Sequence, residues 1–384
     1  MDVPKVAPRS AAAELAGLLD SPEIAALIAD LEVTRWTGRP GYPIRAMVGM
    51  TLAKSLYAIP TWTRTVRLVR EHAGLQAALG CQDGPPSEWA CYRFAAKLRA
   101  HRAMLDACIG RVTNNLRGKL KGYGEHVAID ASDMPAYANG QRYVSKNGPE
   151  RERYSDPDAS WGHRSAVSTR KGGGFYGYKL QAAVCTKTGL PVAWSVETAR
   201  ANESMFVAPL IDLARSRGFA VESAAMDKAY DIERVYGECA DRNCLPLIPL
   251  RNTTAVKRGD HLPPECEHGR WTFAGSDRKR GASKWRCPTG ECKPASTWVK
   301  ADRLHTLVPR DTARWKAAYR KRAAVEREFG RLKHEWALAP LRVRGLERVR
   351  LHADLTVLTK LASTLERSRA LTKARVAARA RPRE

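Results

Sequence analysis

The first 120 or so residues carry apolar side chains at helical spacing, interrupted by short runs rich in glycine and proline. An apolar face that returns every three to four residues is the pattern of an amphipathic helix, and Gly/Pro clusters mark its ends. The helices expected on this basis are Ala11–Leu19, Pro22–Leu31, Pro43–Tyr57, Thr61–Leu79 and Ser87–Leu116. We therefore predict an all-helical N-terminal domain over residues 1–120.

From His126 the apolar pattern changes to a period of two, in short runs that are typical of strands. Three strands are expected first, at His126–Asp130, Phe175–Cys185 and Leu190–Val196. The elements expected after them are helix Glu203–Arg217, strand Val221–Met226, helix Asp231–Arg242 and strand Leu245–Leu250. This order predicts a mixed α/β sheet flanked by helices, and it is the order used by the ribonuclease H-like nuclease fold. We expect the polar, Gly-rich segment Ala138–Gly174 to be a loop without a packed core of its own.

The chain is strongly basic, with 65 Lys and Arg against 40 Asp and Glu and a net charge of +25. Most of the excess lies in the last third, because residues 251–310 hold 13 cationic against 6 acidic side chains and residues 311–384 hold 20 against 8. Such an excess favours a polyanionic partner. No segment shows the apolar face and basic flank of a membrane-surface helix, so we expect the partner to be nucleic acid.

Two further features bear on the compartment. No apolar run approaches the ~18 residues that span a bilayer, and the first ten residues lack the apolar stretch of a signal peptide. A cytoplasmic protein is therefore expected. In that compartment the nine cysteines are expected to be thiols or metal ligands, since disulfides are rare there.

The segment from Trp315 to Trp336 carries the most specific pattern of charges. At about 100° per residue on a helix, Tyr319, Arg322, Glu326 and Lys333 fall within a stripe about 60° wide, whereas Glu328 points about 180° away. This face would place one carboxylate among cations that can hold an anionic ligand. A solvated, Arg-rich helix face would show similar charges and stays an alternative.

A second cationic stripe lies in the N-terminal domain, where Arg64, Arg67 and Arg70 follow one another at every third position of an expected helix. Arginines at this spacing suit contacts to DNA phosphates. The alternative is an ordinary surface stripe on a packing domain.

Three carboxylates are candidates for one catalytic site. Asp130 and Asp227 follow strands that would be neighbours in the predicted sheet, and Glu326 arrives on the helix described above. Converging carboxylates repel one another unless cations neutralise them, so the set predicts two Mg²⁺ or Mn²⁺ ions and phosphodiester chemistry. Asp133 competes with Asp130, since an Asp after a strand is often only a turn former, but the apolar run before Asp130 places Asp130 directly at the end of the strand. Asp231 competes with Asp227 but reads better as a helix N-cap.

At these residues the chain resembles the bacterial insertion-sequence transposases of the DDE class whose third acid lies in a Tyr-Arg-Glu-Lys signature. The segments that carry the similarity are Gly38-Arg39-Pro40 with Tyr42-Pro43, Ile129-Asp130-Ala131-Ser132, Asp156-Pro157-Asp158-Ala159, Phe175–Leu180, Asp227–Asp231 and Val325–Lys333. The resemblance implies Asp130, Asp227 and Glu326 as metal ligands, with Tyr319, Arg322 and Lys333 on phosphates of the terminal inverted repeat. The sequence departs from the family at Ser87-Glu88-Trp89-Ala90, where such proteins often have Asp-His-Ser-Thr.

Residues 251–310 separate the last expected strand from the Glu326 helix and are too long for a simple connection. They contain Cys266, His268, Cys287 and Cys292, which could close a tetrahedral zinc site at the tip of a basic β-ribbon. The spacings are not standard, and an ordinary hairpin with reduced thiols is the alternative.

Together these features predict a helical domain at 1–120, a ribonuclease H-like core at 121–250 and 311–370, a ribbon insertion at 251–310 and a basic tail at 371–384. The expected function is that of a transposase that binds its terminal repeats, cleaves them with bound metal and joins the 3′ ends to target DNA. Because transfer needs two ends held together, a homodimer on DNA is expected. The alternatives are a nuclease with the same core that cuts without joining, and an inactive DNA-binding regulator.

Overall fold

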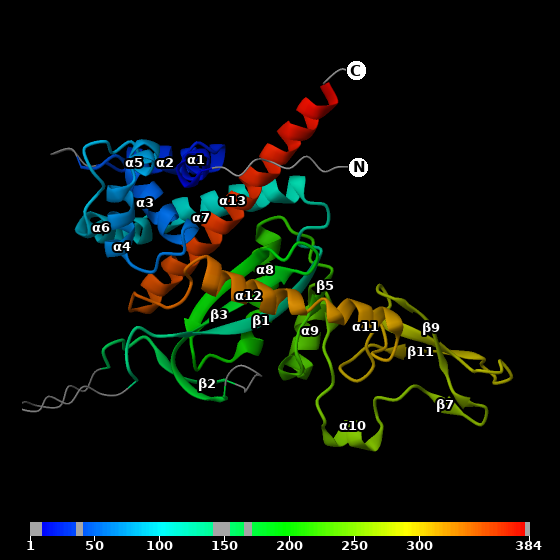
Figure 1. Ribbon diagram of the computed structural model, residues 1–384. Coiled ribbons are helices and arrows are strands. Elements are labelled where there is room, and N and C mark those ends of the chain that lie inside the picture. The colour runs from blue at the N-terminus through cyan, green and yellow to red at the C-terminus, as the bar shows by residue number, and fades with distance from the viewer. Residues whose placement is uncertain (1–9, 36–40, 141–153, 165–170, 381–384) are drawn as a thin grey trace, which may run out of the picture.

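The structure, a computed structural model, describes residues 10–35, 41–140, 154–164 and 171–380 (Figure 1), with side chains described as far as residue 376. Gly38-Arg39-Pro40 therefore lies outside the described residues. In the described part of the chain, no helix combines the length and the apolar character needed to cross a membrane.

Seven helices form the N-terminal part within the described residues up to 120. They are α1 (Ala11–Leu19), α2 (Pro22–Val33), α3 (Ile44–Leu56), α4 (Trp62–Glu71), α5 (Ala73–Leu79), α6 (Glu88–Ala100) and α7 (Arg102–Lys119). The hydroxyls of Ser10, Thr61 and Ser87 accept hydrogen bonds from the first turns of α1, α4 and α6, as N-caps do.

Two helices expected from the sequence are each broken in two, so the prediction of single helices over Thr61–Leu79 and Ser87–Leu116 is wrong. The backbone is extended at His72 (φ −126°, ψ 99°), between α4 and α5. It leaves the helical region again at His101 (φ −108°, ψ 41°), between α6 and α7. Neither break has a glycine or a proline at it, so each lacks the usual sequence signal.

The central sheet has six strands, shown in green and teal in Figure 1. They are β1 (His126–Pro135), β2 (Ser160–Arg164), β3 (Gly173–Cys185), β4 (Pro191–Thr198), β5 (Ser223–Ala225) and β6 (Leu245–Leu247). Strands β1, β3 and β4 are antiparallel neighbours, whereas β1 pairs with β5 and β5 with β6 in parallel. This mixed sheet with its flanking helices is the ribonuclease H-like fold that the sequence predicts.

The segment Ala138–Gly174 is not wholly a loop, contrary to the prediction, because β2 lies within it and pairs with the start of β3. Asp156 anchors the approach to β2. Its fully buried carboxylate accepts hydrogen bonds from the Tyr178 hydroxyl (2.7 Å) and the Gly345 backbone N–H (3.1 Å). A buried acid with two donors fixes the segment against β3 and the start of the last helix, a long-range arrangement that the local pattern does not encode.

Helices α8 (Val207–Ser216), α12 (Ala323–Glu335) and α13 (Leu346–Ala380) pack on the sheet, and α9 (Glu233–Asp241) packs against α8. Helix α13 also packs against α3 and α7 and runs diagonally past the N-terminal helices (Figure 1). One hydrophobic core consequently extends from Leu15 on α1 to Leu365 on α13. The first ten residues of the predicted basic tail, 371–380, belong to this helix.

The insertion, at the right of Figure 1, contains α10 (Thr254–Arg258), a hairpin of β7 (Glu265–Cys266) and β8 (Gly269–Arg270), and a three-stranded sheet. The strands of that sheet are β9 (Thr272–Asp277), β10 (Ala282–Arg286) and β11 (Ser296–Lys300), with β10 in the middle. Its small core is built on Trp285, which is buried and meets Phe273 edge-on at 5.8 Å between ring centroids.

Candidate active site

The parallel pairing of β1 and β5 brings the first two predicted acids side by side. Ala128 lies opposite Ala225, and Asp130 and Asp227 each follow two residues later. The sequence predicts that Asp130 ends its strand. This prediction is wrong, because β1 continues to Pro135. Asp227 ends the neighbouring strand region and accepts a hydrogen bond from the Ala229 N–H (2.7 Å) at the start of a short 3₁₀ turn, η2 (Lys228–Tyr230).

The third acid comes from α12, beside the junction with α11 (Ala313–Arg320). The single helix predicted from Trp315 to Trp336 is therefore interrupted. At the junction the Arg322 N–H donates to the Tyr319 carbonyl (2.8 Å) and the Val325 N–H to the Arg322 carbonyl (3.1 Å). These i→i+3 bonds tighten the turn into 3₁₀ geometry, so the angular estimate applies within α12 alone.

Arg322 links the first acid to the third. Its guanidinium donates to the Asp130 carboxylate at 3.0 Å and, through its other terminal nitrogen, to the Glu326 carboxylate. The Arg322 and Asp130 side chains are mostly buried, whereas the Glu326 side chain is 57% exposed. In the described part of the chain the three acids do not form a compact cluster of metal-ligand atoms. The Arg322 guanidinium lies between two of them.

The pKa of Asp130 is raised to about 7, mainly by burial. The Ala131 N–H and Arg322 oppose this rise, and the carboxylates of Asp227 and Glu203 add to it. Glu203 begins a 3₁₀ turn, η1 (Glu203–Phe206), and its carboxylate pairs with Lys179 on β3 at 2.5 Å. The site thus contains more negative charge than Arg322 alone neutralises, which favours a bound cation.

Tyr230 is a second feature of the site that fits a bound cation. Its side chain is buried, and its hydroxyl has no hydrogen-bond partner among the described residues. Burial, followed by the charges of Asp130, Glu203 and Asp227, raises the pKa of Tyr230. A buried hydroxyl without a partner is costly, and this one lies among carboxylates of the kind that bind divalent ions.

A cavity of about 660 Å³ opens beside these residues. Glu203 and Tyr230 line it on one side, and Lys179, Trp161 and Arg251 contribute cationic and aromatic groups. Sequence reasoning missed Glu203, Lys179 and Tyr230 as parts of the site. Tyr230 and Lys179 fall in the segments Asp227–Asp231 and Phe175–Leu180 that carry the family resemblance, but Glu203 has no local signal.

The remaining residues of the predicted Tyr-Arg-Glu-Lys stripe lie close to this site. Tyr319 stacks on Trp315 with ring centroids 4.9 Å apart and planes at 13°. Lys333 lies 3.6 Å from the carboxylate of Asp133, which also pairs with Arg164 at 3.4 Å. Asp133 is therefore not a simple turn former, since it lies within β1 and holds two cations.

Glu328 and Asp231 have partners that point to structural roles. Glu328 is fully buried on the opposite side of α12 from solvent and pairs with Lys360 of α13 at 2.6 Å. Asp231 is not the N-cap predicted from the sequence, because α9 begins at Glu233 with Ile232 as its cap. The buried Asp231 carboxylate instead pairs with Arg303 of the insertion at 2.8 Å. It also accepts from the Tyr236 hydroxyl (2.9 Å).

Arg64, Arg67 and Arg70 are all exposed on α4. Arg67 forms an i,i+4 ion pair with Glu71 at 2.7 Å. The stripe faces solvent, where it could meet a phosphate backbone. In the described part of the chain none of the three arginines forms an ion pair with Asp130, Asp227 or Glu326, and their DNA role stays a prediction.

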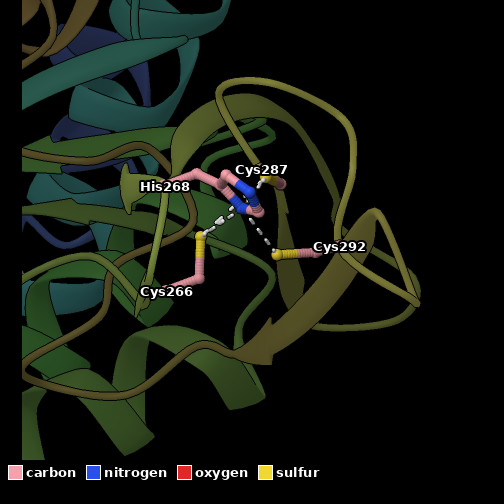
Figure 2. A group of neighbouring side chains, drawn as sticks. All are labelled: Cys266, His268, Cys287 and Cys292. Atoms are coloured by element: carbon pink, nitrogen blue, oxygen red, sulfur yellow. Dashed lines mark hydrogen bonds between the residues drawn. The ribbon is translucent and has the colours of Figure 1, made fainter.

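The four cysteine and histidine residues of the insertion come together (Figure 2), with ligand atoms all within 4.8 Å of one another. The Cys266 and Cys287 sulfurs are 3.8 Å apart, and His268 Nδ1 lies 4.0, 3.8 and 3.5 Å from the sulfurs of Cys266, Cys287 and Cys292. We name this set the Cys/His cluster. Cys266 and His268 lie on the β7–β8 hairpin, whereas Cys287 and Cys292 follow β10.

Comparison with known proteins gives a consistent result. A family model described as a transposase DDE domain matches residues 122–359, and one described as a transposase domain (DUF772) matches residues 4–97. No curated protein matches the chain. A solved structure, "Cryo-EM structure of piggyBac transposase synaptic complex with hairpin DNA (SNHP)", is 10% identical with a TM-score of 0.41, over 94% of this chain and 76% of that one.

DDE transposases cut and transfer DNA and generally use divalent metal ions. The match to the DDE domain covers more than half of the 384 residues and includes Asp130, Asp227 and Glu326. The chain therefore belongs to the transposase DDE-domain family.

Proposed function

We propose that this transposase binds the terminal inverted repeats of its insertion sequence, hydrolyses a phosphodiester at each end and joins the freed 3′ ends to target DNA. The observation that carries the proposal is the convergence of three acids from distant parts of the chain. The β1–β5 register sets Asp130 beside Asp227, and Arg322 ties Asp130 to Glu326.

Asp130, Asp227 and Glu326 would hold the divalent ions, two Mg²⁺ or Mn²⁺ per active site. The raised pKa of Asp130 and the unpartnered Tyr230 hydroxyl fit such ions. Bound there, the ions would activate a water or a 3′-hydroxyl and stabilise the leaving oxygen. The protein itself holds the three carboxylates in position, and the Asp130 carboxylate is largely buried.

Arg322 occupies a position between carboxylates that a cation would take over. With ions held by Asp130 and Glu326, the Arg322 guanidinium would be free to contact a DNA phosphate, for which its planar fork is well suited. Tyr319, supported by its stack on Trp315, and Lys333 would contact phosphates on the same side. Arg64, Arg67 and Arg70 would bind the DNA backbone at the helical end of the protein.

The cavity beside Glu203 and Tyr230 gives the reacting strand a place to lie. Its lining mixes the cations of Lys179 and Arg251 with the ring of Trp161, a combination typical of nucleic-acid grooves. We assign the helical part (1–120) to DNA binding or dimerisation, the core (121–250 and 311–370) to catalysis, and the insertion (251–310) and tail (371–384) to DNA contact. A bacterial, nucleoid-associated homodimer on DNA completes the proposal.

The test uses labelled duplexes that carry the inverted repeats flanking the gene, with cut positions mapped on both strands. We expect Mg²⁺-dependent nicks that leave a 3′-hydroxyl at the element end, and strand-transfer product when pre-cleaved ends meet a target plasmid. Cleavage without any joining would reduce the function to that of a nuclease. Binding without cleavage in Mg²⁺ or Mn²⁺ would leave only a DNA-binding regulator.

The second metal of the proposal is a structural zinc ion in the Cys/His cluster. Zinc binds sulfur at about 2.3 Å and nitrogen at about 2.0–2.1 Å in a tetrahedron, which sets sulfur–sulfur edges near 3.8 Å and sulfur–nitrogen edges near 3.5 Å. The Cys266–Cys287 sulfur separation of 3.8 Å equals the first edge, the separations of 3.5 to 4.0 Å to the imidazole lie at or slightly above the second, and all four ligand atoms lie within 4.8 Å of one another.

The surroundings of His268 also fit a zinc ligand. Its Nδ1 faces the three sulfurs, and its Nε2 lies 3.0 Å from the carboxylate of Glu291. A carboxylate behind a ligating imidazole fixes the tautomer and orientation of the ring. An ion there would tie the β7–β8 hairpin to the β9–β11 sheet, a join that neither the small core nor a strand pairing provides.

Elemental analysis of the purified protein tests the zinc assignment. We expect about one zinc per chain in the wild type and in Cys81→Ala, which removes a buried cysteine outside the cluster, and much less in Cys287→Ala. Glu291→Gln should bind zinc about tenfold more weakly, because it loses the outer carboxylate. Wild-type protein without zinc, or with a Cys266–Cys287 disulfide, would contradict the assignment.

A further inference from the structure

A second cleft, of about 570 Å³, lies between the helical part of the chain and the segment that leads into α13. Its lining comes from α3, α4, α6 and α13, from residues 342–344 and from Tyr137. None of the three proposed metal ligands lines it. The volume suits a small ligand or one or two nucleotides.

The charged residues that line this cleft all have the same sign. They are Lys54, Arg93, Arg99, Arg342, Arg344 and Arg348, and no aspartate or glutamate is among the lining residues. Burial lowers the pKa of Arg99, and the charge of Arg348 lowers it further. Cations gathered in this way repel one another unless an anion joins them.

Lys54 shows the excess of positive charge in the cleft most clearly. Its side chain is 7% exposed, and its ammonium lies 5.2 Å from the centre of the Trp62 ring. In the described part of the chain no carboxylate forms an ion pair with it. Burial lowers the pKa of Lys54 to about 8. An ammonium buried without a carboxylate is costly, so Lys54 points to an anionic ligand in the cleft.

The same cleft exposes aromatic rings. Trp89 is 75% exposed, Tyr92 51% and Tyr137 45%, and the guanidinium groups of Arg342 and Arg344 lie over Tyr137 at 5.1 and 5.2 Å. Large exposed aromatic groups are uncommon unless a partner covers them. Trp89 is also one of the four residues, Ser87-Glu88-Trp89-Ala90, at which the sequence departs from the Asp-His-Ser-Thr pattern of the family that it resembles.

Cations without acids, together with exposed aromatic rings, match the two parts of a nucleotide. Phosphates are held by arginine and lysine, and bases stack on Trp and Tyr. In a duplex the base faces are already stacked on one another and cannot reach these rings. We infer that the cleft binds unpaired nucleotides of a DNA strand, with the phosphates on Lys54 and the arginines and a base on Trp89, Tyr92 or Tyr137. This inference rests on the proposed function, since it takes DNA as the ligand.

Fluorescence anisotropy with a labelled single-stranded oligodeoxynucleotide tests the inference, using full-length protein at fixed salt. Tyr92→Ala is compared with Tyr42→Ala, because both tyrosines lie in the helical part and are 51% and 41% exposed, but only Tyr92 lines the cleft. We expect Tyr92→Ala and Trp89→Ala to weaken single-strand binding about tenfold and Tyr42→Ala to leave it unchanged. Duplex binding should change less than twofold in all three variants.

Photo-crosslinking supplies a readout that does not depend on a variant. A single strand containing bromodeoxyuridine should cross-link to the peptide that holds Trp89 and Tyr92 or to the one that holds Tyr137. Equal single-strand binding by Tyr92→Ala and Tyr42→Ala, or cross-links confined to other peptides, would overturn the inference. Metal-dependent cleavage by the same protein would show in that case that the proposed function stands while the cleft assignment fails.

Discussion

The carboxylate site and the Cys/His cluster are organised in opposite ways. In the carboxylate site an arginine lies between two of three acids, Glu326 is 57% exposed, and a buried hydroxyl lacks a partner among the described residues. In the Cys/His cluster the four ligand atoms already lie within 4.8 Å of one another, and a carboxylate supports the imidazole from behind.

The contrast separates two uses of a metal. In a closed tetrahedral set of soft ligands, the free energy of metal binding stabilises the fold, so the ion stays bound. Carboxylates shared with an arginine, and partly open to solvent, can accept ions together with a DNA strand. We therefore propose that metal is permanent in the insertion and is recruited with substrate in the core.

The largest effect is expected from removing single charges of the core site. Asp130→Asn, Asp227→Asn and Glu326→Gln should each lower cleavage by at least about a thousandfold, because each loses part of a metal site that supplies several kcal/mol. End binding, measured by gel shift, should persist. The readout is the initial rate of end nicking in Mg²⁺.

Glu328→Gln on the same helix is the matched control. It breaks a buried ion pair with Lys360, so we expect it to lose about 3–5 kcal/mol of stability while keeping its cleavage rate per folded molecule. Thermal melting and active-site-normalised rates measure the two quantities. Full stability with lost cleavage in Glu328→Gln would reverse the roles of the two glutamates.

The next largest effect is expected from removing zinc from the Cys/His cluster. A strong chelator should loosen the insertion, so that hydrogen exchange rises about tenfold or more in β7–β10, while the sheet strands β1, β3 and β4 keep their protection. Mass spectrometry of hydrogen exchange follows both regions in one sample. If hydrogen exchange in β7–β10 were the same with and without the chelator, the proposal of a permanent metal in the insertion would be wrong.

Arg322→Ala tests whether the arginine holds the place of the recruited ions. Without it, Asp130 and Glu326 lose their counter-charge, so Mn²⁺ should bind at least as tightly as in the wild type, whereas cleavage falls about a hundredfold for want of a phosphate contact. Isothermal titration and nicking rates provide the two readouts. A large loss of Mn²⁺ affinity would show instead that Arg322 is needed to position the acids.

The smallest effect is expected for Tyr230→Phe. Deleting a buried hydroxyl without a partner should raise the stability of the metal-free protein by about 1 kcal/mol and lower the cleavage rate about tenfold. Denaturant unfolding and nicking assays measure the pair of changes. A loss of stability would indicate that the hydroxyl is already satisfied in the folded protein.

The parts of this account that the sequence predicts are those with a local signal. The apolar runs before Asp130 and Asp227 predict neighbouring strands, and the helical period separates Glu326 from Glu328. The Cys/His cluster follows from the residue types in one insertion.

The parts that sequence reasoning missed depend on contacts between distant segments. The breaks at His72, His101 and Lys321–Arg322 lack glycine and proline, and β2 forms because the buried Asp156 anchors its segment. Glu203 and Lys179 meet across η1 and β3, and the cationic cleft combines side chains from α3, α4, α6 and α13. No single stretch of sequence contains enough of either site to predict it.

The central claim is that Asp130, Asp227 and Glu326 together bind divalent ions. The most direct measurement is the anomalous signal of Mn²⁺ in crystals of the protein bound to its DNA end. The account predicts two manganese peaks coordinated by these three carboxylates, with Arg322 moved onto a phosphate. Two results would contradict the account. One is an absence of manganese peaks in crystals soaked in saturating Mn²⁺, and the other is peaks elsewhere while Arg322 still bridges Asp130 and Glu326.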